Sequence, residues 1–167
     1  RVADEGLLEQ FFSLSGDSLS NIFNQMGLPQ EMIAIYRKVS IERSDKIRIH
    51  TGMTDLFENL KEQGFSCALC TGKDRERTLM ILKELNIDIY FDEIVCSDDV
   101  TYPKPNPESL LVLMERLEVG KENIVMIGDA NNDIKCAKGA GIDVIAVTWG
   151  DVPKKILLDD SPDYIVD

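Results

Sequence analysis

The chain has 167 residues, of which 44% are hydrophobic and 29% charged, and its formal net charge is −12. This length and apolar fraction suffice for one domain core with or without a small lobe, and they exclude a disordered chain. Such an acidic chain argues against nucleic acid, which clustered Lys and Arg bind, and favours a small-molecule or protein partner. Because the sequence has neither an apolar run near the roughly 20 residues of a membrane helix nor a signal-like start, we expect a cytoplasmic protein without membrane contact.

The first part of the chain, residues 1–46, has a helical pattern and no convincing strand. Apolar residues at helical spacing predict three short helices, the second ending at Gly27 and the third starting near Pro29. We expect these helices to form a small lobe. The segment 13–17 between the first two has the composition of a binding loop, although a plain turn in which Asp17 or Ser18 caps the next helix is the alternative.

Helices and strands alternate from Ile47 onward, which predicts an α/β domain over residues 47–167 with a parallel sheet and right-handed crossovers. The predicted helices lie around residues 53–60, 79–85, 110–117 and 134–137, and the predicted strands are 65–70, 93–96, 124–127, 144–147 and 164–166.

The four cysteines lie within apolar patterns and are predicted to be small buried hydrophobes. The Cys67-Ala-Leu-Cys70 sequence has the spacing of a zinc or redox pair, but an offset of three places the two cysteines on opposite faces of a strand.

The stretch 124–133, Ile-Val-Met-Ile-Gly-Asp-Ala-Asn-Asn-Asp, predicts a buried strand that ends in a sharp turn at Gly128. The turn presents Asp129 and Asp133 at the carboxyl end of the strand, where ligands bind in open α/β sheets. Two hard oxygen donors there suit Mg²⁺. The alternative is that Asp129 or Asn131 merely caps the following helix.

Two other segments carry candidate phosphate ligands. In Thr71-Gly72-Lys73, a hydroxyl and backbone N–H groups at a helix amino terminus form an anion site, unless Thr71 or Asp74 simply caps the helix. Lys104 lies between prolines that stiffen the backbone and fix the direction of its ammonium, which indicates a fixed anion; the alternative is an exposed lysine in a turn.

Together these features resemble the haloacid dehalogenase (HAD) superfamily of phosphohydrolases, and most closely its phosphoglycolate phosphatase and β-phosphoglucomutase branch. The resemblance implies a HAD-like, Rossmann-like parallel sheet core with a helical cap, of which residues 1–46 would be the larger part. It lies in segments that match the pattern of the family in type, order and spacing, namely residues 69–73, 104–108, 127–129 with Asp133, and 147–150.

The resemblance also implies an Mg²⁺-dependent phosphomonoester hydrolase that acts on a small phosphorylated metabolite through an aspartyl-phosphate, or a sugar phosphomutase. Thr71 and the N–H of Gly72 would hold the phosphoryl oxygens, and Lys104 would neutralise both the nucleophile and the phosphate. Asp129 would ligate Mg²⁺, and Asp133 would bind the ion or orient its waters.

The cap of this family carries the substrate-specific contacts, and the candidates for them here are Ser15 and Gly16. Arg75 would either reach the substrate or stabilise its own helix.

One defining feature of the family is missing: a first strand ending in Asp-x-Asp, whose first aspartate attacks phosphorus. Asp4 follows no apolar strand, and Asp98-Asp99 comes at the wrong place in the order. In the family that strand is central, between the strands that here are 65–70 and 124–127. We therefore expect the nucleophile on an amino-terminal segment outside these 167 residues, and we expect the chain alone to fold poorly and to be inactive.

Two other classes of protein are alternatives. The first is a pseudoenzyme or interaction module that has lost the chemistry, which the joint presence of Thr71, Lys104, Asp129 and Asp133 disfavours. The second is a phosphoacceptor receiver domain, which is disfavoured because Lys104 precedes the Asp129 strand instead of following the hydroxyl strand late in the chain.

Overall fold

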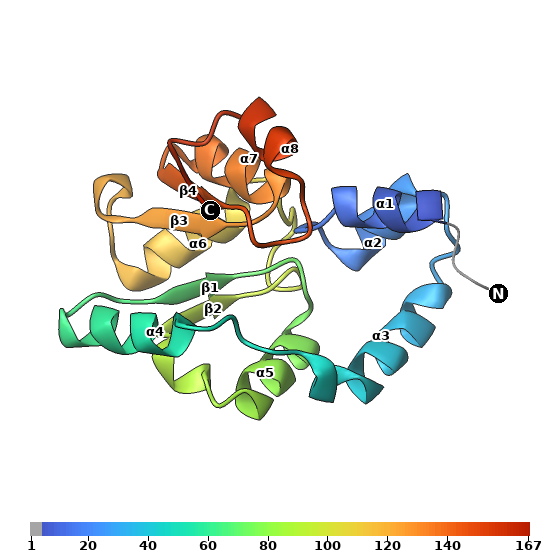
Figure 1. The fold of residues 1–167 in the computed structure, drawn as a ribbon, viewed down its shortest axis with the longest axis horizontal. Coiled ribbons are helices and arrows are strands. Elements are labelled where there is room, and N and C mark those ends of the chain that lie inside the picture. Colours follow the sequence, from blue (N-terminus) through green and yellow to red (C-terminus); the bar gives the residue numbers. More distant parts are fainter. Residues whose placement is uncertain (1–4) are drawn as a thin grey trace.

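The computed structural model of the chain describes residues 5–167 and has parallel strands flanked by helices, with three further helices to one side (Figure 1). This architecture confirms the predicted α/β class. Asp4 and the first residues of the expected lobe lie outside the described part. The helices are α1 (Glu5–Ser13), α2 (Leu19–Gln25), α3 (Met32–Glu42), α4 (Met53–Glu62), α5 (Arg75–Glu84), α6 (Glu108–Leu117), α7 (Asn131–Ala140) and α8 (Lys154–Asp159), with short 3-10 turns at η1 (Ser44–Lys46), η2 (Asp88–Tyr90) and η3 (Lys121–Asn123). The strands are β1 (Ala68–Cys70), β2 (Glu93–Val95), β3 (Val125–Gly128), β4 (Asp143–Val147) and β5 (Tyr164–Val166).

The strands form two separate parallel sheets. β1 pairs with β2, and β3, β4 and β5 form a three-stranded sheet in that order. β1 and β3, the strands that precede Thr71 and Asp129, are therefore each at the edge of a sheet, and they face each other across a groove of about 750 Å³. The groove is lined by Ala68, Leu69 and Cys70 on one side, by Val125, Met126 and Ile127 on the other, and by Leu110 and Leu113 of α6.

The core lies mainly around the three-stranded sheet. Helices α6 and α7 place fully or nearly fully buried side chains, such as Leu113 and Ile134, against Val144 and its neighbours on β3 and β4. Burying each large aliphatic side chain contributes about 1.5–3 kcal/mol, so this cluster fixes the sheet on which Asp129 stands. Cys96 and Cys136 belong to the buried interior as predicted, whereas Cys67 and Cys70 are only half-buried.

The structure differs from the sequence prediction at β1 and at α8. Strand β1 begins at Ala68 instead of residue 65, because Gly64 adopts φ +82° and the N–H of Phe65 bonds back to the Leu60 carbonyl, which extends the end of α4 into the expected strand. The sequence pattern also missed α8, a six-residue helix after Pro153 whose one fully buried contact is Leu157. So short a helix shows little periodicity, and tertiary packing stabilises it.

Helices α1–α3 lie beside the carboxyl ends of the strands, with α3 extending toward α5 (Figure 1). Aromatic contacts join them, including Phe11 and Phe23 against Tyr36 of α3. Among residues 5–167, none of the helices combines the length and apolar character needed to cross a lipid bilayer.

Candidate active site

Lys104 links three of the segments singled out in the sequence. It is only 5% exposed, and its Nζ donates to Asp133 Oδ1 at 2.6 Å and to the carbonyl of Cys70, at the end of β1, at 3.1 Å. Burial alone would lower the pKa of Lys104, but the Asp133 carboxylate raises it above its ordinary value, so the ammonium stays charged. The alternative of an exposed lysine in a turn is therefore wrong.

Asp133 is held in place from both sides. Its Oδ2 accepts a hydrogen bond from the Ala130 N–H at 3.1 Å, across the first turn of α7, while Oδ1 accepts from Lys104. Gly128 is needed for this arrangement, because a Cβ there would lie 2.5 Å from the Asp133 Cβ. The residue that precedes α7 is Ala130, so the interpretation of Asp129 or Asn131 as the helix cap is wrong.

Asp129 stands at the end of β3 with its carboxylate free of ion pairs to described residues. Desolvation and the nearby Asp133 charge raise its pKa. A Cβ at Gly150 would lie 2.1 Å from Asp129 Oδ2, so only glycine lets the loop after β4 pass so close. Mg²⁺ uses one or two carboxylates and keeps several waters. Asp129 fits as a direct ligand and Asp133 as a partner for bound waters, and the nearby Asn131 Oδ1 is buried without a hydrogen-bond partner among the described residues.

The loop after β1 leaves its hydroxyl available for an anion. Asp74 caps α5 by accepting a hydrogen bond from the Arg77 N–H at 3.1 Å, so Thr71 is not the cap. The Thr71 Oγ1 instead accepts a hydrogen bond from the Lys73 N–H at 3.2 Å. Lys73 is an exposed residue that lies close enough to Asp129 for their charges to interact. Sequence reasoning gave Lys73 no role of its own, and its electrostatic contact with Asp129 appears only in the fold.

The lobe reaches the site through the segment 13–17. Asn132 of α7 donates to the Ser15 carbonyl at 3.1 Å, and Gly16, at φ +88°, packs against Ala130. A Cβ at Gly72 would lie 2.4 Å from the Gly16 carbonyl oxygen. Ser15 and Gly16 therefore lie against the loop after β1 and the start of α7. The helix-cap interpretation of this segment is also confirmed, because the side chain of the adjacent Ser18 caps α2.

A cysteine pair beside the lysine was missed in the sequence. The thiols of Cys70 and Cys136 interact, which lowers the pKa of Cys70 and raises that of Cys136, and the Cys136 thiol donates a hydrogen bond to the Asn106 carbonyl at 3.2 Å. Their positions, at the end of β1 and within α7, are 66 residues apart in the sequence numbering, so no local motif signals the pair.

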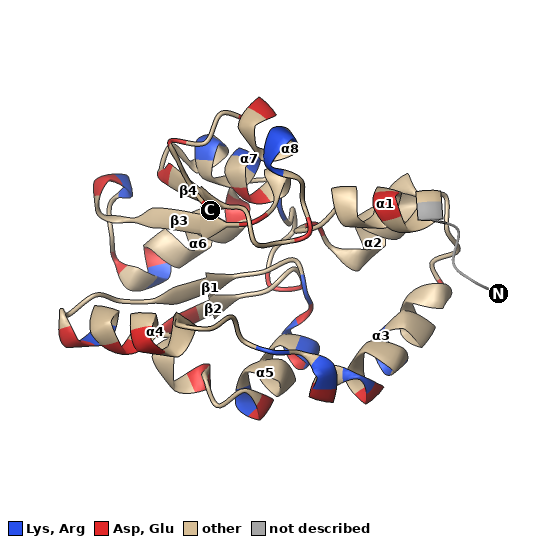
Figure 2. Cartoon of the chain, viewed as in Figure 1, with Lys and Arg blue, Asp and Glu red and all other residues tan. Residues whose placement is uncertain are grey.

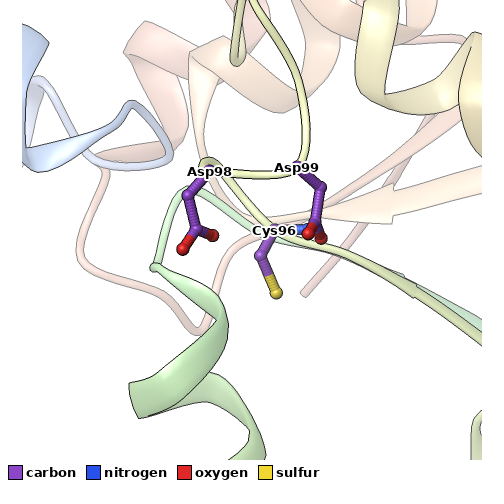
Figure 3. A group of neighbouring side chains, drawn as sticks. All are labelled: Cys96, Asp98 and Asp99. Atoms are coloured by element: carbon purple, nitrogen blue, oxygen red, sulfur yellow. The ribbon is translucent and has the colours of Figure 1, made fainter.

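The acidic cluster after β2 is engaged in structural contacts. Cys96, Asp98 and Asp99 lie close enough to share a cation (Figure 3), but Asp99 accepts from the Arg75 guanidinium and the Cys96 N–H, and Asp98 accepts from the Arg75 N–H. Arg75 also donates to the Ile94 carbonyl. Of the two roles considered for Arg75, the structure therefore has the stabilising one, joining α5 to the end of β2.

Two carboxylates, a buried lysine and a hydroxyl loop thus come together beside the carboxyl ends of β1 and β3 in an α/β protein. The sequence model of the haloacid dehalogenase-like hydrolases matches residues 5–147, and the chain belongs to this family. The resemblance in the motifs is thereby confirmed.

Individual proteins are also similar to this chain in sequence and in structure. The chain is 37% identical over 138 residues to the pyrophosphatase PpaX of Halalkalibacterium halodurans, covering 82% of this chain and 64% of that protein. It is 32% identical over 162 residues to the pyrophosphatase PpaX of Bacillus mycoides, covering 95% and 75%. A solved structure from Haemophilus somnus, described as a predicted phosphoglycolate phosphatase, has the same fold with a TM-score of 0.80 at 23% identity, covering 99% of this chain and 79% of that one.

Proposed function

We propose that the protein is an Mg²⁺-dependent phosphatase that acts on a small phosphorylated metabolite through an aspartyl-phosphate. The observation that carries the proposal is the Lys104–Asp133 ion pair, which is buried beside the free carboxylate of Asp129 and contacts the strand that leads to Thr71. A helix cap or a surface turn requires none of these side chains to meet.

The groove between β1 and β3 is a suitable position for a strand that carries the nucleophile. Val125 and Ile127 of β3 are 48% and 54% exposed along it, although they are apolar and belong to a parallel strand, a kind that is usually covered. A parallel strand in this groove would pair with both edges and would end beside Thr71, Lys104 and Asp129. We propose that it carries the nucleophilic aspartate, outside these 167 residues, and that the chain without it is inactive.

The chemistry follows from the charges. A carboxylate oxygen of the first aspartate would attack phosphorus as the bond to the leaving oxygen breaks, and the second aspartate of the Asp-x-Asp segment would protonate that oxygen. The same group, now ionised, would take a proton from the water that hydrolyses the acyl phosphate. Lys104 neutralises the approaching anions, and Thr71 with the Gly72 N–H holds the phosphoryl oxygens. Mg²⁺, held by Asp129 and through waters by Asp133, would let the two anions approach each other. Residues 1–46 would form part of a cap over this site, with Ser15 and Gly16 facing it.

Two substrates deserve direct comparison. A phosphomonoester fits the resemblance, and inorganic pyrophosphate enters because the two PpaX relatives are named pyrophosphatases. A sugar phosphomutase uses the same aspartyl-phosphate and would transfer the phosphoryl group to a sugar hydroxyl instead of to water.

The test uses the intact protein, meaning the chain together with the proposed strand that carries the nucleophile. Phosphate release is measured from p-nitrophenyl phosphate, phosphoglycolate and pyrophosphate, with Mg²⁺ and with excess EDTA. We expect hydrolysis of at least one of them that EDTA abolishes, and loss of this activity in Asp129→Asn with an unchanged circular dichroism spectrum. Arg116→Lys, on the surface of α6, is the matched control and should keep full activity. Full activity in Asp129→Asn, or no hydrolysis by the wild type, would overturn the proposal.

A further inference from the structure

A second cavity lies between the lobe and the core, away from the groove. It has a volume of about 320 Å³ and is enclosed by α2 and α3 on one side and by α5 and the segment after β2 on the other. Its apolar wall includes Leu19, Ile33 and Val100, and its polar wall includes Arg37, Asp74 and Arg77. Such a volume accommodates a small organic molecule.

Arg77 is the unusual residue of this cavity. Its side chain is only 4% exposed, its Nε donates to Asp74 Oδ2 at 2.8 Å, and its guanidinium lies 5.7 Å from the centre of the Tyr36 ring. Within residues 5–167, no group accepts a hydrogen bond from its two terminal nitrogens. Because Arg77 lines the cavity, the donors that Asp74 does not use can meet water or a ligand there.

Arg37 brings a second positive charge from the lobe. Its Nε lies 3.0 Å from the same Asp74 Oδ2, and its side chain is 49% exposed. Figure 2 shows Lys and Arg gathered where α3, η1 and the start of α5 meet, although the whole chain is acidic. Asp74 thus balances one of the two guanidinium groups and leaves one positive charge facing the cavity.

The other acidic group of the lining moderates that charge. Asp98 also borders the cavity, and its Oδ1 accepts a hydrogen bond from the Arg75 N–H. With two arginines and two aspartates, the lining has no net charge before a ligand enters. A monoanion suits this balance better than a doubly charged phosphate, and a planar carboxylate matches two parallel guanidinium donors.

We propose that this cavity binds the carboxylate of a small organic acid, with both terminal nitrogens of Arg77 donating to its two oxygens and Arg37 closing the site from the lobe. The apolar wall takes the carbon skeleton of the ligand. The carboxylate belongs either to the phosphorylated substrate, since Asp74 of the cavity wall closely follows Thr71 and Gly72 in the sequence, or to a separate acid. The binding itself does not depend on the proposed hydrolase activity.

Binding is measured by isothermal titration calorimetry on the intact protein, with lactate and benzoate as probes and lactamide and benzamide as their uncharged counterparts. We expect saturable binding of at least one acid and none of its amide. Arg77→Lys keeps the positive charge but loses the two parallel N–H donors of the guanidinium, and should weaken binding about tenfold or more. Arg37→Gln, which changes a half-exposed side chain and leaves the fold intact, should weaken it about fivefold. Arg116→Gln, another exposed arginine in an ion pair, should bind like the wild type.

The outcomes separate the possibilities. Equal binding of acid and amide, no binding of either acid, or equal affinities for Arg37→Gln and Arg116→Gln would overturn the proposal. Binding should persist in Asp129→Asn, so the binding experiment can be interpreted even if the phosphatase proposal fails. Competitive inhibition of p-nitrophenyl phosphate hydrolysis by the bound acid assigns the carboxylate to the substrate, whereas non-competitive inhibition or none assigns it to a separate ligand.

Discussion

The ion pair between Lys104 and Asp133 allows a quantitative prediction. Both side chains are 6% exposed, and the Lys104 Nζ also satisfies the Cys70 carbonyl. Lys104→Met keeps most of the apolar volume but leaves the Asp133 carboxylate buried without its counter-charge. Removing one partner of a buried pair costs about 3–5 kcal/mol, so we expect the free energy of unfolding to fall by that amount. Turnover should fall about 100-fold or more, because a preorganised charge is lost.

The assay is urea unfolding of the intact wild type, Lys104→Met, Asp133→Asn and the double variant, followed by circular dichroism. In the double variant no unpaired charge remains, so its loss of stability should be about 2 kcal/mol smaller than the sum of the two single losses. The matched control is Arg116→Met, which breaks a pair 3.4 Å long whose side chains are 40% and 33% exposed, and should cost less than about 1 kcal/mol. Strict additivity, or equal costs for Lys104→Met and Arg116→Met, would refute the reasoning.

Two further predictions concern the lobe and the pH dependence of stability. Gly72→Ala would place a Cβ 2.4 Å from the Gly16 carbonyl oxygen, so the loop of the lobe must move; we expect a lower melting temperature and faster proteolysis within residues 13–17, and wild-type values for both would contradict the packing. Burial would raise the pKa of Asp74, but hydrogen bonds and charge from Arg77 lower it overall. A carboxyl whose pKa is lower in the folded state stabilises the fold above its unfolded pKa of about 3.9 and loses this contribution as pH falls through the folded value. Urea unfolding between pH 6 and pH 2.5 should therefore show a shallower acid limb in Asp74→Asn than in the wild type, and parallel limbs would disprove it.

Local patterns determined much of the fold. The alternation after Ile47, Gly64 at the end of α4 and the apolar run before Gly128 predicted the α/β class, because burial and backbone freedom act over a few residues. The order of Thr71, Lys104 and Asp129 likewise pointed to the family that the sequence comparison confirmed. The roles of these residues in catalysis stay predictions.

Other features depended on contacts between distant segments. Burial of Lys104, the pairing of Cys70 with Cys136 and the Arg77 cavity each join side chains from separate elements, so no local spacing signals them. Arg75 shows the same limit, since its stabilising contact depends on Asp99, which the turn after β2 places next to the start of α5. The sequence by itself determined which residue types stand at the ends of the strands. Tertiary structure decided which of them are buried and paired, because the cost of burying a charge depends on what the fold brings next to it.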